Sequence, residues 1–176
     1  RRDAIYLPDE RQVPGVPSAP SLAIDPLGDG FAAGWMMSYG AEHAFVVNQL
    51  GGEMRDVELG RVRVMANDEP WSTTVAMRDG TIAMMFGTER GPTTFARVLP
   101  DNTVETTTIV LAHFCDALAG TVTGYVAKCQ RAGVPQELVH FDATGKVTRI
   151  EDSAVFTHLA AARDAVVQGG GDRHVR

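Results

Sequence analysis

Apolar and β-branched residues alternate with short turns along most of this chain, and the alternation recurs. Three segments share the order of an apolar strand, a tight turn and a second apolar strand. Their turns lie at Asp29-Gly30, Asp79-Gly80 and Ala119-Gly120. Because glycine adopts the positive φ that tight hairpin turns require, these dipeptides predict three β-hairpins.

A third strand, a second tight turn and a fourth strand follow each hairpin. The third strands are predicted at 43–50, 93–99 and 137–141. The fourth strands begin at Met54, Val104 and Val147. The spacing between the first and second turns is similar in the three copies, and unrelated hairpins would rarely produce such regularity. Four strands in about 40 to 50 residues are typical of one propeller blade.

Corresponding strand positions of the repeat carry large apolar residues. Since one face of each strand has to be covered, we expect most of these residues to be buried. The predicted core consists of Ile24, Phe31, Trp35, Val75, Ile82, Met84, Phe95, Val110, Val122, Tyr125 and Val139.

The two ends of the chain differ from the full copies. Residues 1–20 contain four prolines, which forbid a helix and favour an extended arm. Residues 153–167 fit either an amphipathic helix that Ser153 would cap or the first strands of a fourth copy. The second interpretation is favoured, because 162–167 align with the turn of the second copy. The glycine-rich residues 168–176 predict a flexible tail.

The repeat resembles the bacterial β-propeller repeat proteins, over 21–167. The resemblance rests on the turns, since the signatures of the WD, kelch and sialidase-type repeats are absent. It implies an all-β fold of three to four four-stranded antiparallel blades, forming a partial β-propeller. The copies would span 21–64, 71–110, 110–152 and, in part, 153–167. A β-sandwich or barrel is the competing fold. No catalytic residue of these families can be transferred to this sequence.

The number of copies predicts a partner. Propellers close with about four to eight blades, and a shorter row of blades leaves sheet faces and strand edges uncovered. We therefore expect another protein chain, or a second copy of this one, to complete the propeller.

Charge and hydropathy exclude two classes of partner. The net charge is -6, and the 16 basic residues are scattered among 22 acidic ones, so the chain is not expected to bind nucleic acid. No apolar run reaches the length of a membrane span. The chain begins Arg1-Arg2 without a methionine, as a processed fragment or a mature secreted chain would. Resemblance to the bacterial propellers implies a secreted or cell-envelope location, and a cytoplasmic one stays open.

Two cysteines, Cys115 and Cys129, lie at unequal distances from the turn predicted at Ala119-Gly120. Residues so placed would not face each other across the hairpin. Two buried thiols are therefore favoured over a disulfide.

No set of residues has the spacing of a metal, cofactor or catalytic site. The five histidines are dispersed, although His43 and His140 both fall near third strands and His113 and His158 near first strands. The acidic stretch 25–30 reads as a hairpin turn, because Pro26 and Leu27 stand where calcium ligands would be needed. No catalytic, cofactor-binding or metal-binding residue is predicted.

Two functions remain open. The first is a non-catalytic interaction or scaffold module of the propeller type that assembles with another polypeptide. The second is one part of a propeller enzyme, a hydrolase or lyase, whose active site another chain completes. The lack of an internal catalytic set favours the interaction module.

Overall fold

The structure is a computed structural model, and it describes residues 16–18, 20–25, 27–28, 30–50, 56–109, 114–130, 136–152, 158–162 and 165–169. All regular elements within these ranges are β-strands, so the predicted all-β class is confirmed. The strands form three antiparallel sheets of four or five strands and one separate hairpin. None of the sheets closes into a barrel within the described ranges.

Sheet A contains the strands of the first predicted copy. Its strands are β1 (Val16–Pro17), β2 (Ser21–Ile24), β3 (Phe31–Tyr39), β4 (Glu42–Leu50) and β5 (Asp56–Arg63). The short strands β1 and β2 pair with the two ends of β3, so together they form one interrupted edge. Ser18 holds the interruption to the sheet, because its backbone N–H donates to the Met36 carbonyl and its hydroxyl accepts from the Met36 N–H.

Sheet B repeats this arrangement. It consists of β6 (Pro70–Ser72), β7 (Ala76–Arg78), β8 (Thr81–Thr88), β9 (Thr93–Val98) and β10 (Val104–Ile109). Strands β6 and β7 again form one interrupted edge along β8. Here Thr73 holds the interruption, since its hydroxyl accepts the Met85 N–H at 3.0 Å. Both interrupted edges therefore use a hydroxyl side chain to replace ladder hydrogen bonds.

Sheet C is an uninterrupted meander and a separate hairpin, sheet D, follows it. Sheet C contains β11 (Phe114–Gly120), β12 (Gly124–Gln130), β13 (Glu137–Asp142) and β14 (Val147–Asp152). Sheet D contains β15 (His158–Ala162) and β16 (Ala165–Gly169). The strand interpretation of the C-terminal segment is therefore confirmed for these residues, and the helix alternative is wrong.

One of the three predicted hairpin turns is confirmed at its predicted position. Arg78 pairs with Thr81, which leaves Asp79 and Gly80 as a two-residue turn with φ values of 47° and 71°. These positive values are the reason that glycine is favoured at this position. Strands β2 and β3 also form a hairpin, but the Asp25 N–H donates to the Gly30 carbonyl, so their connection is longer than a two-residue turn at Asp29-Gly30, and Asp29 lies outside the described residues.

The third predicted turn is displaced. Ala119 and Gly120 belong to β11, and Gly120 pairs with Tyr125, so the turn is formed by residues 121–124. The glycine has a different purpose, because a Cβ at Gly120 would lie 2.2 Å from the Met77 carbonyl oxygen. Gly120 thus allows β11 to approach β7 closely and does not shape a turn.

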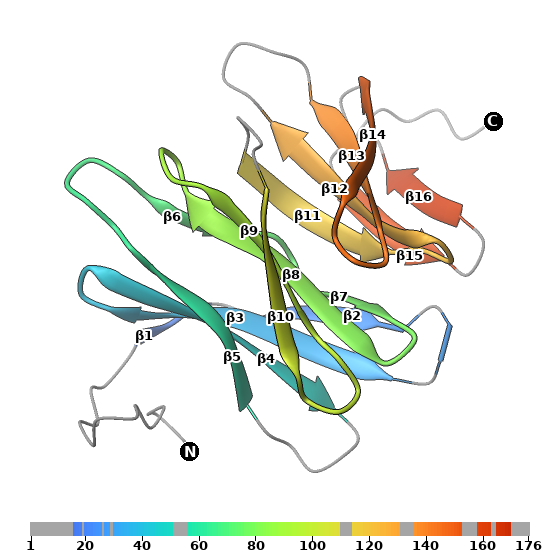
Figure 1. The fold of residues 1–176 in the computed structure, drawn as a ribbon, viewed down its shortest axis with the longest axis horizontal. Coiled ribbons are helices and arrows are strands. Elements are labelled where there is room, and N and C mark those ends of the chain that lie inside the picture. Colours follow the sequence, from blue (N-terminus) through green and yellow to red (C-terminus); the bar gives the residue numbers. More distant parts are fainter. Residues whose placement is uncertain are drawn as a thin grey trace.

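The sheets are stacked in the order of the sequence, with sheet B between A and C (Figure 1). The first strands lie next to one another along one side of the stack: β2 contacts β7, β7 contacts β11 and β11 contacts β15. Sheet B is covered on both faces, which explains why nearly all of β8 is buried. Its outermost strand, β10, is largely exposed and rich in threonine.

Aromatic contacts fill both interfaces of sheet B. Between sheets A and B, Phe45 and Phe86 stack with their ring centroids 4.2 Å apart. Between sheets B and C, Phe95 meets Tyr125 edge to face at 5.3 Å and stacks on Phe141 at 5.6 Å. Burial raises the pKa of Tyr125 to about 12, so this phenol stays protonated at neutral pH.

Most of the predicted core is confirmed, and three members are wrong. Six of the eleven predicted residues are buried: Val75, Ile82, Met84, Phe95, Tyr125 and Val139. Trp35 is half-buried, and Val110 lies outside the described residues. Ile24 and Phe31 are exposed because no described sheet covers their face of sheet A, and Val122 is exposed because it lies in the displaced turn.

Candidate functional site

The histidines do not gather into a site within the described residues. As expected, His43 lies on the third strand of sheet A and His140 on that of sheet C. His43 accepts or donates a hydrogen bond with the Ser38 hydroxyl at 3.1 Å, and burial lowers its pKa. The His140 Nε2 lies 3.0 Å from the Glu151 carboxylate. His158 is on β15, and His113 and His174 lie outside the described residues.

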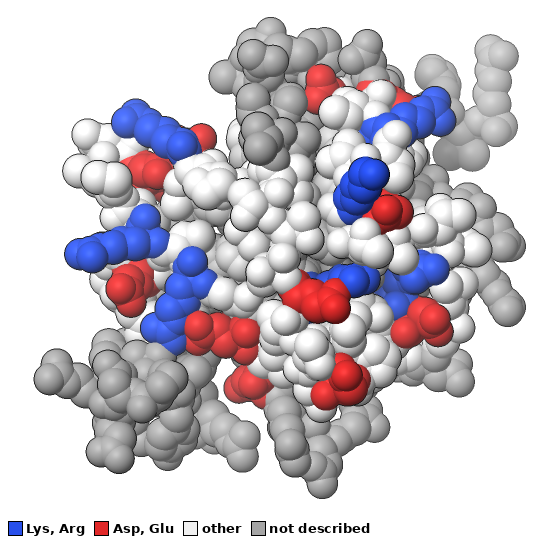
Figure 2. Space-filling model, in the orientation of Figure 1, with Lys and Arg blue, Asp and Glu red and all other residues white. Residues whose placement is uncertain are grey.

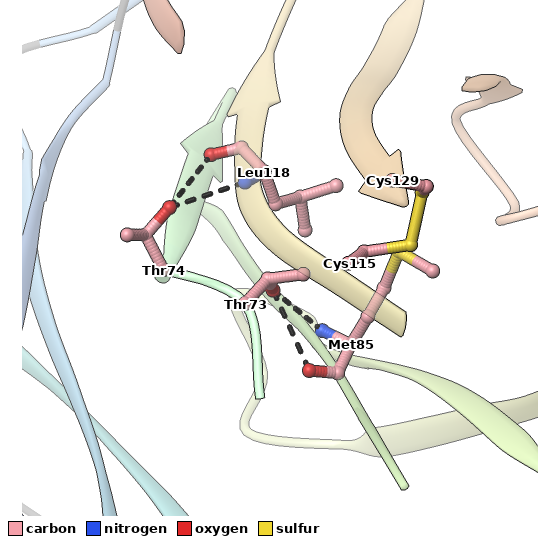
Figure 3. The surroundings of a disulfide bond; sticks show 6 residues. All are labelled: Thr73, Thr74, Met85, Cys115, Leu118 and Cys129. Atoms are coloured by element: carbon pink, nitrogen blue, oxygen red, sulfur yellow. Dashed lines mark hydrogen bonds between the residues drawn. A yellow bond between two sulfur atoms is a disulfide. The ribbon is translucent and has the colours of Figure 1, made fainter. Parts of the chain in front are cut away.

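Cys115 and Cys129 form a disulfide, which corrects the expectation of two free thiols (Figure 3). Two features bring them opposite each other. The turn is centred downstream of Gly120, which brings the two cysteines nearer to equal distances from it. A β-bulge between Cys115 and Ala117 adds one residue to β11 and so places Cys115 opposite Cys129. The two Cα atoms are consequently 3.9 Å apart. The sequence carries no signal for the bulge, so the pairing could not be read from spacing.

Small hydroxyl side chains join the sheets along their first strands. The Ser21 hydroxyl of sheet A accepts the Val75 N–H at 2.9 Å and donates to a carbonyl of its own sheet. The Thr74 hydroxyl of sheet B accepts the Leu118 N–H of sheet C at 3.1 Å, as Figure 3 shows. The same device therefore links A to B and B to C.

Asp25 joins the sheets through a buried carboxylate. It follows β2 directly, is 4% exposed, and accepts the N–H groups of Asp79 and Gly80 at 3.0 and 2.7 Å. It also accepts the Leu27 N–H within its own loop. The Asp25 carboxylate thus caps the hairpin turn of the next sheet.

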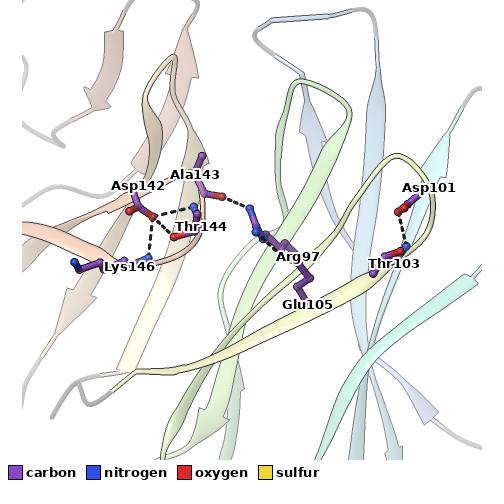
Figure 4. A network of polar contacts seen from close by, with 8 residues as sticks. All are labelled: Arg97, Asp101, Thr103, Glu105, Asp142, Ala143, Thr144 and Lys146. Atoms are coloured by element: carbon purple, nitrogen blue, oxygen red, sulfur yellow. Dashed lines mark hydrogen bonds and ion pairs between the residues drawn. The ribbon is translucent and has the colours of Figure 1, made fainter.

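Arginine side chains make corresponding links further along. Arg78, at the end of β7, donates to the carbonyls of Thr121 and Val122 in the turn of sheet C, both at 2.8 Å. Arg97 of β9 donates to the Ala143 carbonyl and pairs with Glu105 (Figure 4). Each arginine reaches a turn of the following sheet.

The second turns of sheets B and C are held by aspartates. Asp142 accepts the backbone N–H groups of Thr144 and Lys146 and the Thr144 hydroxyl, and this hydroxyl is the main reason that the Asp142 pKa is lowered (Figure 4). Asp101 accepts the Thr103 N–H in the equivalent turn, which lowers the Asp101 pKa. Both carboxylates therefore stabilise the backbone of a turn.

The outer face of sheet A carries an apolar patch of Leu22, Ile24 and Phe31. Leu22 is 71% exposed, Ile24 67% and Phe31 49%. The register makes the patch continuous, because Ile24 pairs with Phe31 and Leu22 pairs with Ala33 on the same face. Its neighbours on this face are a small apolar cluster of Trp35, Met37, Tyr39, Ala44 and Val46.

A pocket of about 280 Å³ opens beside this patch. The first strands of sheets A, B and C line it, and its lining contains no charged side chain. Leu22 and Ile24 belong both to the apolar patch and to this pocket.

A larger groove of about 530 Å³ lies between β5, the connection from β5 to β6, and the turn between β8 and β9. We call it the arginine groove, because Arg61, Arg63 and Arg90 line it. Its other lining includes Val62, Met65 and Pro92, so charged and apolar groups lie side by side. The sequence carries no signal for it, since Arg61 and Arg63 come from sheet A and Arg90 from a turn of sheet B.

Elsewhere the charges are mixed. Lysine and arginine alternate with aspartate and glutamate over the face that Figure 2 shows, and no extended area carries one sign. Among the described residues, no cluster of three or more histidine, cysteine or acidic side chains could hold a metal ion. A search of the described residues also finds no helix of the length and hydropathy that a membrane crossing requires.

Comparison with known proteins finds no matching family model, no matching curated protein and no matching solved structure. What this chain does must therefore be inferred from its own residues. The features that stand out are surfaces: the apolar patch with its adjoining pocket, and the arginine groove.

Proposed function

We propose that this chain is a non-catalytic interaction module of the β-propeller type, which assembles with another polypeptide through the outer face of sheet A. The apolar patch of Leu22, Ile24 and Phe31 is the observation that carries the proposal. Three large apolar side chains from two paired strands are exposed together, next to a pocket that no charged side chain lines. Contiguous exposed apolar surface of this kind typically marks a protein interface.

The stacking of the sheets supports a propeller-type arrangement. Sheets A, B and C are successive four-position meanders whose first strands lie side by side, and β15 continues that row. Blades of a propeller are four-stranded meanders arranged radially in this manner. In such a row the inner face of sheet A packs on sheet B, so the outer face is the one that a further blade would cover.

The proposed partner supplies a β-sheet to that outer face, as sheet B does to the inner one. A second copy of this chain could do so with its own terminal sheet, and a different polypeptide could do so as well. The obligate contact is expected to bury more than about 2,000 Å² and to be more apolar than ordinary surface.

We propose a secreted or cell-envelope location for the module. The disulfide between Cys115 and Cys129 supports this, because disulfides persist mainly in oxidising compartments.

The native mass of the purified chain tests the proposed assembly. Native mass spectrometry or sedimentation at micromolar concentration should find an oligomer, or a second polypeptide that copurifies with the chain. A folded monomer near 18.9 kDa, with cooperative unfolding that does not depend on concentration, would contradict the proposal.

A charged variant locates the interface. Leu22→Glu combined with Ile24→Glu should dissociate the assembly and leave the fold intact, because both side chains are already exposed to solvent in the single chain. Ile150→Glu is the matched control, since Ile150 is 50% exposed on sheet C, away from the patch. Equal loss of assembly in both proteins would argue against the outer face of sheet A as the contact.

A further inference from the structure

The walls of the arginine groove are fixed to each other at one end. The Asp68 carboxylate accepts the N–H of Glu69 at 3.0 Å and that of Arg90 at 3.2 Å. The Glu89 N–H donates to the Glu69 carbonyl at 3.0 Å. Hydrogen bonding, chiefly from the Thr88 side chain, lowers the pKa of Asp68, so this carboxylate is ionised at neutral pH. The connection from β5 to β6 is therefore held against the turn between β8 and β9.

Most cations of the described chain are already bonded. Arg61 makes two hydrogen bonds of 2.7 Å to the Glu58 carboxylate. Arg78 donates to backbone carbonyls. The other bonded cations each pair with a carboxylate, and they are Arg97, Lys128 and Arg149.

Arg63 and Arg90 differ from these, since neither guanidinium makes an ion pair or a hydrogen bond to another described residue. Among the eight described cations, only Lys146 shares this property, and it lies on sheet C. Both guanidinium groups line the same groove, where the Arg90 charge also interacts with the Asp68 carboxylate, on a chain whose net charge is -6. The groove is thus lined by more positive than negative side chains, although the whole protein has a negative net charge.

We propose that the arginine groove binds an acidic, apolar peptide segment of a partner polypeptide. A guanidinium presents a fork of donors that matches the two oxygens of a carboxylate. Between the cations, Val62 and the 78% exposed side chain of Met65 offer apolar contact. The ligand therefore combines carboxylates with neighbouring apolar side chains.

A polyanion such as a phosphorylated segment fits the groove less well. The ionised carboxylate of Asp68 belongs to the lining, and it would repel a doubly charged phosphate group more strongly than a singly charged carboxylate. The volume of about 530 Å³ lies in the range of sites that hold a few side chains. The groove shares no residue with the apolar patch of sheet A, so the two contacts are independent.

Titration calorimetry with synthetic peptides tests the site. The probe is a capped peptide in which leucine and glutamate alternate, and its control replaces each glutamate with glutamine. The glutamate peptide should bind at least about fivefold more tightly, because an exposed guanidinium contributes modestly to each ion pair. The preference should weaken as salt is raised.

Two variants with equal loss of charge locate the binding. Arg63→Gln with Arg90→Gln should abolish the preference for the glutamate peptide, and Lys146→Gln with Arg149→Gln should retain it. All four side chains are exposed, so the unfolding midpoints should match that of the parent chain, and the native mass should not change.

Several outcomes would overturn the proposal. Binding of neither peptide, equal binding of both, or equal loss in the two double variants would each do so. Tighter binding of inorganic phosphate than of the glutamate peptide, lost in Arg63→Gln with Arg90→Gln, would assign the groove to phosphate groups instead.

Discussion

Individual polar side chains fix how one sheet lies against the next. Asp25, Ser21 and Thr74 each accept backbone N–H groups from a neighbouring sheet, and Arg78 donates to carbonyls in one. Such bonds specify position in a way that apolar burial cannot, because they are directional and leave a buried group unsatisfied if the sheets slide.

Replacement of Asp25 by alanine should cost about 2–4 kcal/mol of unfolding free energy, because the N–H groups of Asp79 and Gly80 would lose a charged acceptor. Chemical denaturation of the variant and the parent measures this difference. Asp25→Asn retains one acceptor oxygen and should lose less. An alanine variant as stable as the parent would show that the turn finds other acceptors.

The burial of each strand depends on its place in the stack. The central strand β8 is buried over nearly its whole length, since sheets A and C cover both of its faces, whereas β10 at the outer edge is almost fully exposed. Within sheet C, the hairpin of β11 and β12 is further constrained by a disulfide that closes a sequence separation of 14.

Loss of this disulfide should destabilise the chain by about 3 kcal/mol, the value expected when a loop of this length is no longer closed in the unfolded state. The double variant Cys115→Ala with Cys129→Ala, compared with the parent in denaturant, measures the effect. Reducing agent should lower the stability of the parent alone. If it lowers that of the double variant as well, the disulfide is not the cause.

The whole molecule is a row of sheets held by two aromatic interfaces, with an apolar patch exposed on part of one end face. Phe45 and Phe86 fill the interface between sheets A and B, and Phe95 with its two aromatic neighbours fills the interface between B and C. The end face carries the apolar patch of Leu22, Ile24 and Phe31, where the row stops within the described residues.

Truncation of Phe86 to alanine should cost about 3–5 kcal/mol, since it removes a fully buried ring from the interface of sheets A and B. Thermal or chemical unfolding measures the loss. Phe114→Ala, at a side chain that is 42% exposed on β11, is the matched control and should change stability by much less. Similar losses in both variants would mean that the stacked ring pair contributes little.

The sequence by itself determined the features that depend on local chemistry. The turn at Asp79-Gly80 could be predicted because aspartate and glycine tolerate the positive φ that both positions adopt. The third strand of each sheet lies at an apolar run that a turn follows. The strands from His158 onward could be predicted because their spacing continues the predicted repeat. Turns and strands of this kind are specified mainly by residues that are close in the sequence.

Only the tertiary structure decided which apolar residues are buried and which polar groups meet. Ile24 and Met84 look alike in the sequence, yet one is exposed and the other buried, because burial depends on whether another sheet covers that face. The pairing of Cys115 with Cys129 required a bulge that no local signal marks. Arg63 and Arg90 come to one groove from different sheets, and the distance along the chain between such residues carries no information about their separation in space.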